Sequence, residues 1–186
     1  MTIGTTDIFL LVIIVSTLVV GFFWGAVRSL MLFAGWIIAF FAGAYLQLEL
    51  GAYLARQWDN FDDAFNQMAA FGLIYTAILV AAPVVIFITT RSSQRVTRWQ
   101  VLDDLVGALF AVFVAVLGIA GVMIILATYY GSDPVVEVAG GPQWTANLMQ
   151  SLLLSNIGSN IYEHLVPIIG FILGPILPAS VNEVFA

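Results

Sequence analysis

The sequence has 186 residues, of which 62% are hydrophobic and 9% are charged, with a formal net charge of -6. Average soluble domains carry about 25% charged residues, so this composition excludes a free soluble globular protein and favours an integral membrane protein. The absence of cysteine excludes disulfides and cysteine-based metal sites, and the acidic balance argues against binding to nucleic acid.

Four stretches reach the roughly 20 apolar residues that a membrane-spanning helix needs. They cover residues 8–27, 29–48, 69–90 and 105–130. The first two follow each other almost directly, so we expect a tight helical hairpin with Arg28 at its tip. None of the four contains Asp, Glu, Lys, Arg or His. Since ion pathways and proton relays use ionisable residues at membrane depth, a pore or transporter is the least favoured class.

The segment between the second and third spans is too polar to cross the bilayer. Its apolar residues recur at three- and four-residue spacing, which predicts an amphipathic interfacial helix over residues 50–67. The fold class predicted for residues 1–130 is therefore an all-α membrane domain with four spans and one interfacial helix.

Residues 131–186 form a separate, more polar region that we expect outside the cytoplasm. A helical pattern over residues 143–166 predicts one or two interfacial helices. The following run, Pro167 to Pro178, is apolar but only about a dozen residues long, with proline at both ends. Because proline breaks helices and the run is too short to cross, it is predicted to be re-entrant, interfacial or packed on a partner.

Arginine placement predicts the orientation of the chain. Four of the five arginines lie in the first and third connections, namely Arg28, Arg91, Arg95 and Arg98. Cytoplasmic connections carry an excess of Lys and Arg, so these two connections are predicted to be cytoplasmic. Both chain ends then lie outside the cytoplasm.

Small residues at four-residue spacing predict where the spans approach each other, because close backbone approach drives helix association in lipid. The rows are Gly21 and Gly25 in the first span, Gly35, Ala39 and Gly43 in the second, and Gly107, Ala111 and Ala115 in the fourth. We expect the rows of the second and fourth spans to supply the closest contacts.

Two motifs resemble the colicin V production (CvpA-like) family of bacterial inner-membrane proteins. The family begins with Asp before the first span, then has an Arg-Gly-x-x-Arg-Glu turn and a second span with Gly-Trp; its fourth span opens with Asp-x-x-Leu-Gly-x-x-Phe-Gly. The matching residues are Asp7, Gly25, Arg28, Trp36, Asp103, Gly107 and Phe110. Trp24 and Ser29 stand where the family has Arg and Glu, which indicates a divergent member.

The resemblance implies a non-enzymatic envelope protein, connected with the export or production of a colicin, that acts as a scaffold or as an assembly and envelope-maintenance factor. An alternative from the residues themselves is an accessory subunit of a larger photosynthetic or respiratory membrane complex. Either function predicts membrane lipids and other membrane subunits, or a second copy, as partners, and the bacterial inner membrane as location.

No residue pattern for catalysis or for a metal site stands out, and no cofactor is expected. The acidic pair Asp103 and Asp104 fits the start of a helix better than acid–base chemistry. The single histidine, His164, is a weak candidate for binding a pigment or a haem, since imidazole is a good axial ligand.

Overall fold

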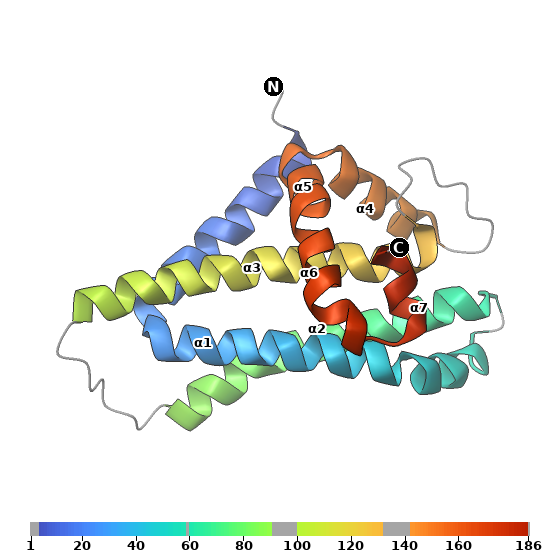
Figure 1. Cartoon of the computed structure of the whole chain (residues 1–186), viewed down its shortest axis with the longest axis horizontal. Coiled ribbons are helices and arrows are strands. Elements are labelled where there is room, and N and C mark those ends of the chain that lie inside the picture. Colours follow the sequence, from blue (N-terminus) through green and yellow to red (C-terminus); the bar gives the residue numbers. More distant parts are fainter. Residues whose placement is uncertain (1–3, 59, 91–99, 132–141, 186) are drawn as a thin grey trace.

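A computed structural model describes residues 4–58, 60–90, 100–131 and 142–185. Every regular element among these residues is a helix (Figure 1), so the predicted all-α fold class is confirmed. Four helical stretches are long and apolar enough to cross a membrane, and they are Thr5–Ala55, Asp63–Thr90, Gln100–Tyr130 and Asn156–Ile176.

Helix α1 (Thr5–Ala55) contains both of the first two predicted spans. Its 51 residues would measure about 77 Å as a straight helix, more than twice the roughly 30 Å hydrocarbon core. The helix is interrupted at Gly25, where φ is 78° and ψ is 173°. Figure 1 shows the two halves of α1 as a V with its tip at this break. The sequence predicted the tip of the hairpin at Arg28, but the turn lies three residues earlier, at Gly25. Only glycine adopts this backbone conformation readily.

Helices α2 (Asp63–Thr90) and α3 (Gln100–Tyr130) contain the third and fourth predicted spans and pack against α1. Aromatic rings fill the space between the second half of α1 and α2. Phe40 contacts Phe71 and Tyr75 edge-on, with ring centroids 5.6 and 6.4 Å apart, and all three side chains are fully buried. Edge-to-face contacts of this kind add about 0.5–1.5 kcal/mol per pair.

The separate interfacial helix predicted over residues 50–67 does not form. Instead α1 continues to Ala55, and α2 begins at Asp63. Two aromatic residues of this segment pack toward α3: Phe65 lies 4.8 Å from Phe61 and 5.6 Å from Tyr129 of α3, measured between ring centroids. Spacing alone could not distinguish a helix lying on lipid from two helix ends packed on α3.

The C-terminal region is a chain of short helices. They are α4 (Gln143–Leu154), α5 (Asn156–Asn160), the π-helical turn η1 (Ile161–Leu165), α6 (Val166–Leu173), the 3-10 turn η2 (Gly174–Ile176), α7 (Ala179–Asn182) and η3 (Glu183–Phe185). In Figure 1 the run from α5 to α6 passes across α3 rather than alongside it.

The prediction that proline breaks the helix at Pro167 is wrong. The helical run continues from Asn156 to Ile176 through this proline. The turn η1 precedes it, and there the Val166 N–H donates to the carbonyl of Ile161, five residues earlier. Proline clashes with the carbonyl four residues back in a regular α-helix, and a π-helical turn is one of the local rearrangements that interrupt that geometry.

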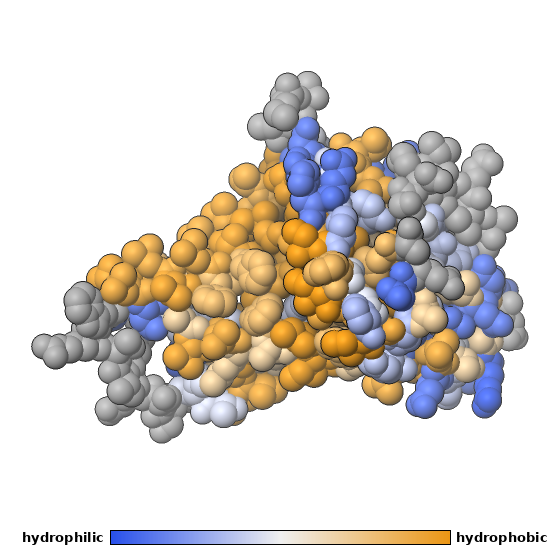
Figure 2. Space-filling model, in the orientation of Figure 1, coloured by the Kyte–Doolittle hydropathy of each residue, from blue (hydrophilic) through white to orange (hydrophobic). Residues whose placement is uncertain are grey.

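The tail is docked onto the bundle. Gln47 Nε2 donates to Ser180 Oγ over 3.0 Å, and the Tyr45 hydroxyl donates to the carbonyl of Ile176. On the inner side of the tail, Ile169 and Val181 are buried. Figure 2 shows apolar colour over much of the bundle and over α6. Hydrophilic residues gather at the end of the bundle where α1 ends and α2 begins.

Candidate functional site

The break in α1 is held by the start of α3. The Ala26 N–H donates to Asp103 Oδ1 over 3.3 Å, and Asp103 Oδ2 lies where a β-carbon on Gly25 would point. A β-carbon on Gly107 would lie only 2.7 Å from the Gly25 Cα. Three residues of the resembling motifs, Gly25, Asp103 and Gly107, thus form one junction between α1 and α3.

Arg28 ties the same junction to the end of α2. Its Nε donates to Thr90 Oγ1 over 2.9 Å and its Nη2 to the Thr90 carbonyl over 3.1 Å. The neighbouring Ser29 is fully buried, and its hydroxyl has no hydrogen-bond partner within the described part of the chain. The other three arginines of the orientation argument, Arg91, Arg95 and Arg98, lie outside the described residues.

Trp36 connects three helices in the centre of the bundle. Its indole Nε1–H lies 2.9 Å from the Tyr75 hydroxyl and 3.0 Å from the Leu117 carbonyl, and Tyr75 in turn donates to the Gly118 carbonyl over 3.1 Å. The Trp36 ring stacks on Phe40 with centroids 5.5 Å apart. Buried polar groups in an apolar interior need such partners, so these bonds fix the register of α1, α2 and α3.

Asp7 joins the start of α1 to the start of α5. One of its carboxylate oxygens accepts from the Gly4 N–H over 3.0 Å and from Asn156 Nδ2 over 3.2 Å. The other accepts from the Ile157 N–H over 3.0 Å. Asp7 is buried, so its charge is balanced by N–H donors at the starts of α1 and α5, where helix dipoles favour an anion.

The rows of small residues do lie at helix contacts, but they face other helices than those predicted. A β-carbon on Gly21 would collide with Ala111 and with the Gly107 carbonyl, so the row of α3 faces the first half of α1. A β-carbon on Gly43 would collide with the ring of Phe71 on α2. The expected contact between the rows of the second and fourth spans is therefore wrong.

The remaining small residues of these rows have different surroundings. Gly35 faces α2, where a β-carbon would lie 3.1 Å from Ala82 Cβ, and Ala39 is fully buried. Ala115, by contrast, lines an open cavity. Phe110 is half-buried on α3.

His164 lies in the turn η1 on the outside of the tail. Its Nδ1 is 3.1 Å from the Asn160 carbonyl of the same helical run, and the side chain is exposed. No cluster of three His, Cys, Asp or Glu side chains suited to a metal occurs among the described residues. The arrangement gives His164 the role of a helix-surface residue.

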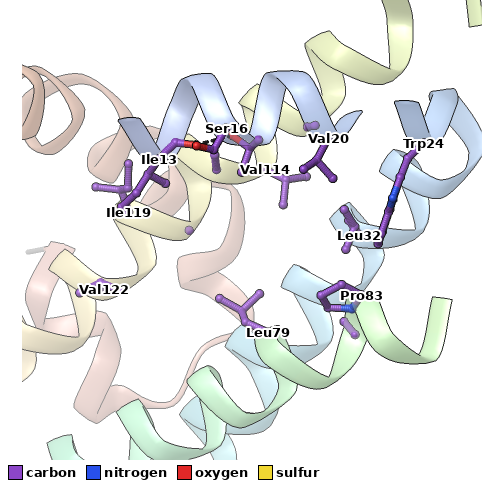
Figure 3. Close-up of a pocket in the computed structure, with 15 residues that line it drawn as sticks. Ile13, Ser16, Val20, Trp24, Leu32, Leu79, Pro83, Val114, Ile119 and Val122 are labelled. Atoms are coloured by element: carbon purple, nitrogen blue, oxygen red, sulfur yellow. Dashed lines mark hydrogen bonds between the residues drawn. The ribbon is translucent and has the colours of Figure 1, made fainter. Parts of the chain in front are cut away.

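A cavity of about 520 Å³ lies among α2, α3 and the two halves of α1. Figure 3 shows Val20 and Trp24 on the first half of α1, Pro83 on α2, and Ile119 on α3 around this space. Sequence reasoning did not find the cavity, because the angle of the V creates it. It also missed Tyr75 and Thr90, whose only signal was a polar group within an apolar run.

A family model described as "Colicin V production protein" matches residues 6–159. No curated protein and no solved structure matches the chain. The matched range contains the junction at Gly25, the bonds of Trp36 and the contact between Asp7 and Ile157.

Proposed function

Because the chain belongs to the colicin V production protein family, we propose that it acts as a non-enzymatic scaffold in the bacterial inner membrane. The family is not known as an enzyme family. The proposal rests on the hydrogen bonds of the polar motif residues. Each of them bonds a second helix or the C-terminal region, and they are Asp7, Arg28, Trp36 and Asp103. These side chains stabilise the bundle rather than face a substrate.

The surface that fits a scaffold is the outer face of α6, defined as Ile168, Phe171 and Ile172. Phe171 is 87% exposed and Ile172 60% exposed. On the opposite side, Ile169 and Gly170 are buried against the rest of the protein. Clustered exposed apolar side chains mark contact sites. We therefore expect another membrane subunit to pack on the outer face of α6.

The proposed orientation keeps the first and third connections in the cytoplasm and both chain ends outside it. The bond from Arg28 to Thr90 supports it, since it brings the tip of the V and the start of the third connection to one end of the bundle. The outer face of α6 then meets its partner on the extracytoplasmic side.

The test is affinity purification after crosslinking in native membranes, with co-purifying chains identified by mass spectrometry. The variant carries Phe171→Gln and Ile172→Gln together, which changes the polarity of the face with little loss of volume. The matched control is Leu109→Gln on α3, which replaces an apolar side chain that is 71% exposed, between the exposures of Ile172 and Phe171.

We expect the double variant to lose its principal co-purifying subunit while Leu109→Gln retains it, with both proteins as heat-stable as wild type. Unchanged partners in the double variant would contradict the proposal. Recovery of respiratory or photosynthetic subunits would favour the alternative of an accessory subunit, and loss of membrane association would show that the face contacts lipid instead.

A further inference from the structure

We infer that the cavity between the two halves of α1, α2 and α3 holds one hydrocarbon chain of a bilayer phospholipid. The cavity, of about 520 Å³, lies among helices that are long and apolar enough to cross the membrane. Its opening is marked by Val20 and Ser16, both of which remain exposed. The medium at that opening is lipid, which makes acyl chains the nearest available occupant.

The lining favours hydrocarbon over water. None of its residues is charged, and most are aliphatic: Ile13, Val20, Leu32, Leu79, Val114 and Ile119. The Thr17 hydroxyl is already bonded to its own helix, to the carbonyls of Ile13 and Ile14. A buried water needs two to four polar partners, and this wall does not offer them.

Gly118 gives an independent reason to place a foreign group there. It lies within α3 and lines the cavity, and a β-carbon added to it would meet no atom within 4 Å. Every other described glycine within a helix has at least one such neighbour, as Gly21 has Ala111. Glycine inside a helix costs about 0.5–1 kcal/mol relative to alanine. The Gly118 carbonyl accepts from the Tyr75 hydroxyl, but no neighbouring atom of the described residues requires the absence of a side chain there. We therefore assign the open space to the occupant.

The size of the cavity favours a chain over a partner helix. An α-helix with its side chains is about 10–12 Å across, whereas about 520 Å³ falls within the 300–1,000 Å³ typical of sites for small ligands. Trp24 lines one end, next to the break at Gly25 (Figure 3). Tryptophan favours the headgroup level of a membrane, so we place the headgroup at that end, beside the tip of the V, with the chain lying along the opening at Val20 and Ser16.

The test is native mass spectrometry of the full chain after reconstitution with a single defined phospholipid, 1-palmitoyl-2-oleoyl phosphatidylglycerol, and transfer to mild detergent. Wild type is expected to retain one phospholipid per chain. Gly118→Phe places a ring in the cavity and is expected to lower the retained fraction at least tenfold. Leu109→Phe, which enlarges an exposed residue of α3 outside the cavity, is the matched control and is expected to retain the phospholipid.

A second variant, Ala115→Leu, fills the same cavity from the next turn of α3 and replaces Gly118→Phe if circular dichroism shows that the latter does not fold. Retention by wild type and loss in a folded filling variant support the inference. It is overturned if wild type retains no phospholipid, if a folded filling variant retains as much as wild type, or if the retained mass is a free fatty acid or a second copy of the chain.

Discussion

The conformation of Gly25 provides the sharpest test of how the fold is held. Gly25→Ala would place a β-carbon on a residue with φ of 78° and ψ of 173°, against the carboxylate of Asp103. Such a backbone costs about 1–3 kcal/mol for a residue other than glycine. Displacing the carboxylate also weakens its bond from the Ala26 N–H, and a hydrogen bond to a charged group contributes about 1.5–3 kcal/mol. We expect a loss of about 2.5–6 kcal/mol, the lower limit applying when the bond is only partly lost.

The matched control is Gly72→Ala. Gly72 lies within α2, and a β-carbon there would make an ordinary contact with Ile125 at 3.8 Å. Alanine in a helix interior is favoured over glycine by about 0.5–1 kcal/mol, so this variant should be slightly more stable than wild type. Both would be unfolded by increasing dodecyl sulfate in mixed micelles and followed by circular dichroism. Equal stability of Gly25→Ala and wild type would refute the positive φ and the Asp103 contact.

Three further outcomes are expected. Trp36→Phe should lower the free energy of unfolding by about 1–3 kcal/mol, because it removes the donor to Tyr75 and Leu117; a double-mutant cycle with Tyr75→Phe measures the shared part, and zero coupling would contradict the bond. Asp7→Asn should speed amide exchange at Ile157, whose N–H loses a charged acceptor; unchanged exchange would count against the contact. Ser93→Cys should not react with an impermeant thiol reagent added outside intact cells, and labelling there would overturn the proposed orientation.

The four predicted spans and the all-α fold followed from the sequence, because hydropathy and length are local properties that add along the chain. The break in α1 could not be placed from the sequence, since glycines occur at both 21 and 25. What accompanies the break at Gly25 is the carboxylate of Asp103, 77 residues after Ala26 in the chain. A single sequence does not show such a partner.

The sequence predicted which residues belong to the candidate site better than it predicted which residues they contact. Trp36 and Asp103 were singled out by the family resemblance, yet their partners Tyr75 and the Ala26 N–H were not. The register between helices decides which groups meet, and one-dimensional spacing leaves that register open. For the same reason the row at Gly107 was paired with the wrong helix. Pro167 was misjudged because a π-helical turn carries no sequence signal of its own.

The contact between Asp7 and the α5 backbone has a consequence for the order of events during synthesis. The N–H of Ile157 that bonds this carboxylate is 150 residues further along the chain. At about 5–20 residues per second, a ribosome needs about 8–30 s to make that stretch. The first helix is therefore made well before its partner, and the Asp7 carboxylate can be bonded by α5 only after that stretch has been synthesised.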